Sequence, residues 1–178
     1  MLRLPALAAC LLLAAGPVAA QHAGHRETHA APLTEPGQGA FAALSEVVAR
    51  LEADPATDWA SVDLGALRDH LIDMDRLVRD AEVTSEAVAG GLRMRVTGDA
   101  AARAAARRMV PAHAAELARD TRWTVAASEE GGAVILQATS DDPATVARIR
   151  ALGFFGLMAS QDHHRAHHWR IATGQGGH

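Results

Sequence analysis

The chain has one cysteine, Cys10, and it contains no lysine and no tyrosine. A single cysteine cannot close a disulfide within the chain, and it excludes the paired-cysteine motifs of zinc sites and of covalent haem attachment. Aromatic residues make up 3% of the sequence, and the formal net charge is −4 with histidine neutral. Because nucleic-acid-binding domains carry a basic surface, we expect no nucleic acid among the partners of this protein.

The only marked apolar run stands near the N-terminus, over residues 4–15 after Arg3. It is too short to span a bilayer. Gly16 and Pro17 end it, and the small residues Val18-Ala19-Ala20 follow. A positive charge, a short apolar region and small residues, in this order, are typical of a secretory signal peptide. We therefore expect residues 1–20 to be removed, and a periplasmic or secreted mature protein that does not span the membrane.

A lipoprotein signal is the alternative interpretation of the same segment. Leu7-Ala8-Ala9-Cys10 resembles such a signal, and lipid on Cys10 would tether the protein to a membrane. The apolar run continues past Cys10 through Leu13, however, so that cleavage there would divide the hydrophobic region. In the preferred interpretation the mature chain loses its cysteine, and its metal ligands must come from other residue types.

The remainder of the chain predicts a single α+β domain over residues 37–170, between a histidine-containing flexible tail at 21–36 and a flexible C-terminus at 171–178. Apolar residues recur at helical spacing over 38–53 and 63–80, and alternate with polar residues over 83–96 and 123–139. A third helix is expected over 99–119 with a kink or break at Pro111, because proline lacks the backbone donor. A fourth is expected from about residue 142 to His168, with an interruption at Gly153 or Gly156.

Each alternating segment is interrupted by a Gly-Gly pair, Gly90-Gly91 in the first and, 41 residues later, Gly131-Gly132 in the second. Glycine pairs of this kind are typical of tight β-hairpin turns. Each predicted hairpin follows a helix and leads into an aspartate-capped one. The pattern predicts a duplicated helix–β-hairpin unit, which would give a four-stranded antiparallel sheet packed against helices.

Ten histidines are the unusual feature of the composition, and they are clustered. Three lie in the tail, at His22, His25 and His29, and five crowd the C-terminus. His70 and Met74 are one helical turn apart, as are Met109 and His113, so each pair is expected on one helix face. The candidate metal ligands are therefore His70, Met74, Met109, His113, Met158, His163, His164, His167 and His168.

Imidazole binds copper, zinc and nickel, while thioether sulfur favours Cu(I). The sequence thus predicts a non-enzymatic, exported metal-binding protein, with copper first and zinc or nickel second. It would act in metal buffering, storage or handover to a metal-transfer protein. Asp69, Asp73 and Asp162 lie close enough in sequence to orient the imidazole rings.

Other interpretations remain open. The methionines also fit apolar helix stripes, and a single histidine often serves as a hydrogen-bonded core residue. Binding of haem b through a His/Met pair, a small metal-dependent enzyme and a pH-sensing interaction module are the alternative functions. No serine-hydrolase arrangement is recognisable in the sequence.

The signal peptide gives the first testable prediction. N-terminal sequencing of the exported protein should begin at Gln21, the residue after the small-residue site. Recovery of a mature chain that begins with lipid-bearing Cys10 would contradict this expectation and show that the protein is tethered to a membrane.

Overall fold

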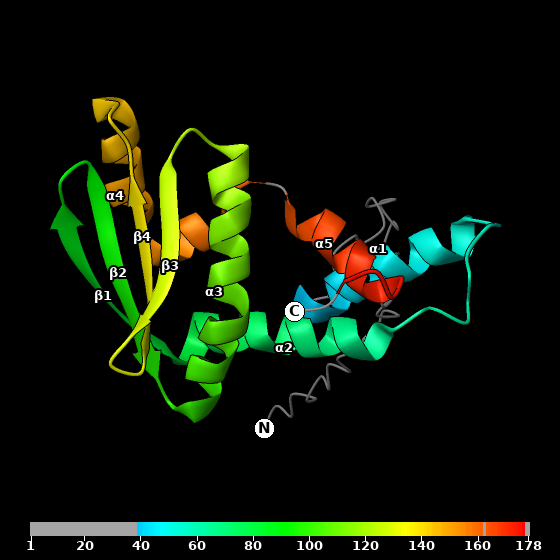
Figure 1. The fold of residues 1–178 in the computed structure, drawn as a ribbon. Helices are drawn as coiled ribbons and strands as arrows, with labels where there is room; N and C mark the ends of the chain where they lie inside the picture. Colours follow the sequence, from blue (N-terminus) through cyan, green and yellow to red (C-terminus); the bar gives the residue numbers. More distant parts are fainter. Residues whose placement is uncertain (1–38, 162, 177–178) are drawn as a thin grey trace, which may run out of the picture. The chain divides into compact units, whose positions relative to one another are not determined.

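The structure is a computed structural model that describes residues 39–161 and 163–176, with His163 described through its backbone alone. The expected signal peptide and histidine-containing tail lie outside these residues. The helices and strands follow in the order α1 (Gly39–Ala53), α2 (Leu64–Asp80), β1 (Ala81–Val88), β2 (Gly91–Gly98), α3 (Ala100–Asp120), β3 (Thr124–Glu130), β4 (Ala133–Thr139), α4 (Pro143–Ala159) and α5 (His163–Ala172) (Figure 1). No helix within these ranges is both long and apolar enough to cross a membrane.

The four strands form one antiparallel sheet in the order β1-β2-β4-β3, so the predicted α+β class is confirmed. The strands β2 and β4 are central, with Met94 paired to Leu136. Alternate residues of these two strands are buried under α3 and α4, while the opposite face carries Arg93 and Arg95. Both arginines hydrogen-bond to Glu130 of β3, which keeps that face polar.

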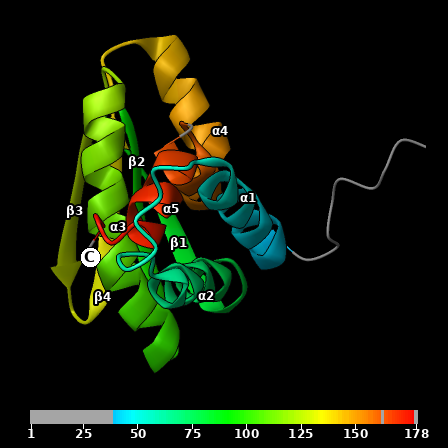
Figure 2. The same cartoon turned by 90° about the vertical axis from the view of Figure 1, so that its right-hand side faces the viewer.

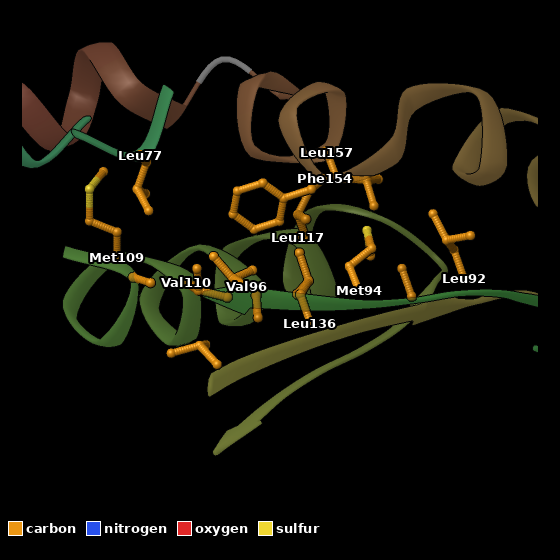
Figure 3. Close-up of a cluster of buried hydrophobic side chains, with 14 of the residues drawn as sticks. Leu77, Leu92, Met94, Val96, Met109, Val110, Leu117, Leu136, Phe154 and Leu157 are labelled. Carbon is orange, nitrogen blue, oxygen red and sulfur yellow. The ribbon is translucent and has the colours of Figure 1, made fainter. Parts of the chain in front are cut away.

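The main hydrophobic core fills the space between the sheet and its helices (Figure 3). Its central side chains come from β2, β4, α3 and α4, and the C-terminal half of α2 adds Leu77. The residues labelled in the close-up are Leu77, Leu92, Met94, Val96, Met109, Val110, Leu117, Leu136, Phe154 and Leu157.

A second, smaller core joins α1, the N-terminal half of α2 and α5. Leu51 of α1, Leu67 and Leu71 of α2, and Ile171 of α5 are buried in it. Helix α2 runs from this core to the sheet, and α5 lies among α1, α2 and α3 (Figures 1 and 2). The middle of α2, which contains His70, therefore passes through the seam between the two cores.

Helix α3 continues through Pro111, so the break expected there is wrong. Pro111 is exposed, whereas Val110, His113 and Ala114 beside it are buried. The pyrrolidine ring thus lies on the solvent side, where it displaces no packed neighbour. Burial of the opposite face holds the helix together and offsets the loss of one backbone hydrogen bond.

The interruption expected at Gly153 or Gly156 is present at Gly153, whose φ of 56° kinks α4. The expected extension of this helix to His168 is wrong, because α4 ends at Ala159 and α5 begins separately at His163. The chain turns at Ser160, whose backbone N–H donates to the Leu157 carbonyl, and at Gln161, which has φ 67°. This turn brings α5 back over α2.

The two hairpins lie in the same sheet, and positive φ angles occur at Gly90, Gly131 and Gly132. Each hairpin follows a helix, α2 in one case and α3 in the other. These positions agree with a repeated unit, but the duplication itself stays a prediction.

Gly91 lies where β2 and β4 approach closely. A β-carbon added there would collide with the Ala138 carbonyl oxygen and lie 2.8 Å from the Cα atom of Thr139. Since both obstacles are backbone atoms, Gly91→Ala should lower the free energy of unfolding by about 1–3 kcal/mol. Chemical denaturation measures the change. Gly39→Ala is the matched control, because open space surrounds Gly39, and equal stability of the two variants would contradict the packing argument.

Candidate metal centre

Five histidine rings from three helices lie together in the seam. The ring centroid of His70 in α2 lies 4.7 Å from that of His167 and 5.3 Å from that of His168. The ring of His113 in α3 stacks on His164 at 5.6 Å, and His164 lies 6.3 Å from His168. The structure thus brings His70, His113 and three histidines of the C-terminal block to one place.

Four of these rings, those of His70, His113, His164 and His167, border a cavity of about 50 Å³, which we call the histidine cavity. A volume of this size holds an ion with a water molecule or two, since a single water needs roughly 10–15 Å³ measured in this way. The lining side chains are His70, Met109, Ala112, His113, Glu116, Met158, His164, His167 and Arg170. Two of the three candidate thioethers therefore border the same space as the imidazoles.

Backbone carbonyls at the C-terminus of α4 orient two of the rings. The last carbonyls of a helix lack partners within it. Nε2 of His113 lies 2.7 Å from the Leu157 carbonyl oxygen, and Nε2 of His164 lies 2.9 Å from that of Met158. A carbonyl oxygen only accepts, so both Nε2 atoms carry hydrogen, and the lone pair of each neutral ring is on Nδ1. Histidines that ligate metals are commonly held by a hydrogen bond of this kind.

His168 contributes a buried nitrogen. Its Nε2 atom is enclosed and has no hydrogen-bond partner among the residues that the structure describes. Burial lowers the pKa of His168 below 6.5, and the nearby His164 lowers it further, while Glu46 acts in the opposite direction. The ring is therefore neutral at pH 7, the form in which imidazole binds a metal.

The position of α5 is determined by contacts outside the histidine cluster. Ile171 and Ala172 are buried in the smaller core. The Ala172 carbonyl accepts a 2.8 Å hydrogen bond from the Asp63 backbone N–H, and Arg50 of α1 lies 4.1 Å above the Trp169 ring. His167 and His168 thus stand on a helix that is anchored independently of any ligand.

An ion pair fixes α2 against α3 one turn from His70. Arg108 donates from Nε and Nη2 to the two carboxylate oxygens of the buried Asp73, at 2.7 and 2.8 Å. Burial alone would raise the pKa of Asp73, but the hydrogen bond and charge of Arg108, with Arg76 and His70, bring it below the ordinary value of 3.8. This pair sets the register between His70 and Met109, which adjoins Arg108.

The expected carboxylate partners of the histidines are bound elsewhere. Asp73 pairs with Arg108, and Asp69 is exposed and pairs with Arg68 at 2.9 Å. Asp162 lies outside the described residues, as do the His163 side chain and the tail histidines. The orienting acceptors are instead the α4 carbonyls, which a pattern of side chains cannot indicate.

Glu116 and Arg170 also line the histidine cavity, and neither is among the ligands predicted from the sequence. Glu116 contacts Arg119 of its own helix, and one carboxylate oxygen lies 4.0 Å from Arg170. Their positions gave a signal, since Glu116 follows His113 and Arg170 follows His167 by three residues, which places each pair on one helix face.

Met74 does not share the histidine cavity. It is half-buried, packs against both cores and lines a separate space beside α4. Its one-turn spacing from His70 therefore does not bring the two side chains to the same cavity.

Within the described parts of the chain, no three side chains of histidine, cysteine, aspartate or glutamate are already grouped as metal ligands. The donors present are pairs of imidazoles beside the thioethers of Met109 and Met158. No protein-family model, curated protein or solved structure matches the chain.

The Asp73–Arg108 pair generates a prediction on stability. Asp73→Asn should lower the free energy of unfolding at pH 7 by about 1–3 kcal/mol, because it removes a charge-assisted, two-point hydrogen bond. The pKa of Asp73 is lowered in the folded state, so this stabilisation is present above pH 4 or so and is lost as the pH falls through the folded-state pKa.

Urea unfolding of both proteins from pH 7 to pH 3 measures the difference. Asp75→Asn is the control, since Asp75 is exposed and pairs only with Arg79 on its own helix. A wild-type advantage over Asp73→Asn that stays constant down to pH 3 would show that the carboxylate charge does not stabilise the fold.

Proposed function

We propose that the protein is an exported metal-binding protein that holds copper, or else zinc or nickel, in the histidine cavity and acts in metal buffering, storage or handover. The observation that carries the proposal is the convergence of four imidazoles on the histidine cavity, beside the buried His168, whose Nε2 atom has no hydrogen-bond partner among the described residues. A buried polar atom without a partner costs free energy, and a metal ion reached by a turn of the His168 ring would supply the missing interaction.

The histidine cluster is better suited to binding a metal ion than to taking up protons in a pH-sensing role. Five protonated imidazoles within a few ångströms would repel one another, and a half-buried site disfavours their charge. The α4 carbonyls hold His113 and His164 with Nδ1 as the lone-pair nitrogen of the neutral ring, which suits metal ligation. This arrangement supports ligation over a pH-sensing role.

The donor set favours a soft or borderline ion. Neutral imidazoles would bind together with the thioethers of Met109 and Met158, and a third imidazole would join after a rotation of its ring. Glu116, on the cavity wall, would partly offset the charge of a divalent ion.

Cavity size argues against the alternatives. The histidine cavity by itself, at about 50 Å³, accommodates an ion but neither a porphyrin nor a substrate of ordinary size, and the space of about 300 Å³ beside it is lined by apolar side chains, methionines and a single titratable group, His164. Haem b binding and metal-dependent catalysis are therefore the less favoured functions, and an intense Soret band in the purified protein would overturn this order.

Metal binding is tested directly with His167→Ala. This variant removes an imidazole that lines the cavity and contacts His70. Its affinity for Zn(II) or Cu(II) should fall by at least the roughly 10–100-fold that loss of an outer-shell partner costs. Competition against a chromophoric chelator gives the affinity, and elemental analysis gives the stoichiometry. Lowering the pH through about 6.5 should also release the metal, because a protonated imidazole has no lone pair.

His25→Ala, in the N-terminal tail, is the matched control and should change the affinity little. Deletion of residues 21–36 should likewise have a smaller effect than the double replacement of His163 and His167. Equal losses in the tail and cavity variants, or no metal on the wild-type protein, would contradict the proposed function.

A further inference from the structure

A second cavity adjoins the histidine cavity, and we call it the thioether cavity. It has a volume of about 300 Å³, and three methionines line it: Met74 from α2, Met109 from α3 and Met158 from α4. His164 of α5 lines it as well. Met109, Met158 and His164 also line the histidine cavity, so the two cavities share a wall, while Met74 borders only the thioether cavity.

The methionines are unevenly distributed over the structure. Of the four within the described residues, Met94 lies in the sheet core and away from both cavities, and the other three meet at the thioether cavity. Core packing accounts for Met94 without further explanation. Met109 is buried in the main core as well, but it borders the cavity together with the half-buried Met74 and Met158, where a thioether can act as a ligand.

The charge of the lining restricts the ion. The residues that line the thioether cavity include no carboxylate, whereas Glu116 lines the histidine cavity. A divalent ion among neutral donors in an apolar space would keep two uncompensated charges, and burial of charge is costly. A monovalent soft ion keeps one charge and binds thioether sulfur well, which describes Cu(I).

The opening of the cavity is apolar. Val78 and Phe155 line it and are 69% and 46% exposed, so large hydrophobic side chains stand at the surface there. Hard, strongly hydrated cations gain nothing from such an opening. The cavity, at about 300 Å³, is also larger than a bare ion, so a second ligand could enter with the ion.

We propose that the thioether cavity is a separate Cu(I) site and that its shared wall passes the ion to the histidine cavity. This inference rests on the proposed metal-binding function and deepens it. Transfer is a ligand exchange in which a bond from copper to an imidazole nitrogen forms as a bond to the Met74 sulfur breaks. Copper stays Cu(I) throughout, so that no electron is transferred.

The test compares two methionine variants of the full chain, Met74→Leu and Met94→Leu. Both keep side-chain volume, so both should fold, but only Met74 lines the thioether cavity. Anaerobic titration of Cu(I) against a chromophoric Cu(I) chelator should show at least about a tenfold loss of affinity for Met74→Leu and none for Met94→Leu. Zn(II) affinity should be unchanged in both.

His70→Gln is the reciprocal variant, since His70 lines the histidine cavity alone. It should weaken Zn(II) binding and leave the Met74-dependent Cu(I) affinity in place. X-ray absorption of the Cu(I)-loaded wild-type protein should show sulfur neighbours, a readout that does not depend on any variant.

The outcomes separate the two proposals. Equal Cu(I) affinity of Met74→Leu and Met94→Leu, or copper surrounded by nitrogen alone, would overturn the thioether site while histidine-dependent Zn(II) binding upheld the proposed function. Loss of neither metal in any variant, or no binding by the wild-type protein, would overturn both.

Discussion

Helix α4 ends in carbonyl groups that need donors from outside the helix, and the rest of the centre depends on how this need is met. The Leu157 carbonyl accepts from Ser160 of the following turn and from the His113 imidazole, and the Met158 carbonyl accepts from the His164 imidazole, so that two different helices supply ring donors. Three helices are thereby joined at one point, and the ring nitrogen that carries hydrogen is defined for both histidines. The break after Ala159 matters for the same reason, because a continuous helix would have paired these carbonyls internally.

The histidine cluster occupies the seam between two apolar cores, where neither core supplies close-packed side chains. Leu77 belongs to the larger core and Leu67 to the smaller, and His70 lies between them on the same helix. Half-polar rings tolerate such a boundary better than aliphatic side chains do, since they can both stack and hydrogen-bond. The Asp73–Arg108 ion pair, one helical turn from His70, holds α2 and α3 at a defined separation beside the histidine cluster.

Much of the fold could be predicted from local patterns. Alternating residues around Gly90-Gly91 and Gly131-Gly132 gave both hairpins, and helical spacing gave the apolar faces of α1 to α3. The end of α4 could not be foreseen, because it depends on positive φ at Gln161, a residue without a special preference for that region. The break predicted at Pro111 was wrong because the effect of a proline on a helix depends on which helix face is buried, and tertiary packing determines that face.

Local spacing also predicted part of the arrangement of the candidate ligands, whereas helix packing determined the rest. Spacing correctly placed His164 near His168, and the clustering of His70 and His113 with the C-terminal block followed from helix packing that only the structure shows. Met74 shows the limit of spacing arguments. Residues four apart share a helix face, but that face can border two cavities, and His70 and Met74 line different ones.

Helix α2 is common to both hydrophobic cores, and this has a consequence for how the domain opens. Helix α2 contributes side chains to both cores. Separation of α1, α2 and α5 from the sheet would therefore also remove Leu77 from the larger core. Detachment of these three helices together is thus coupled to global unfolding, and amide hydrogens in the middle of α2 are expected to exchange among the slowest in the protein. His70 and His113 are buried on α2 and α3, whereas the other histidines of the cluster stand on α5, so fraying of α5 would open the histidine cavity before the sheet core is disturbed.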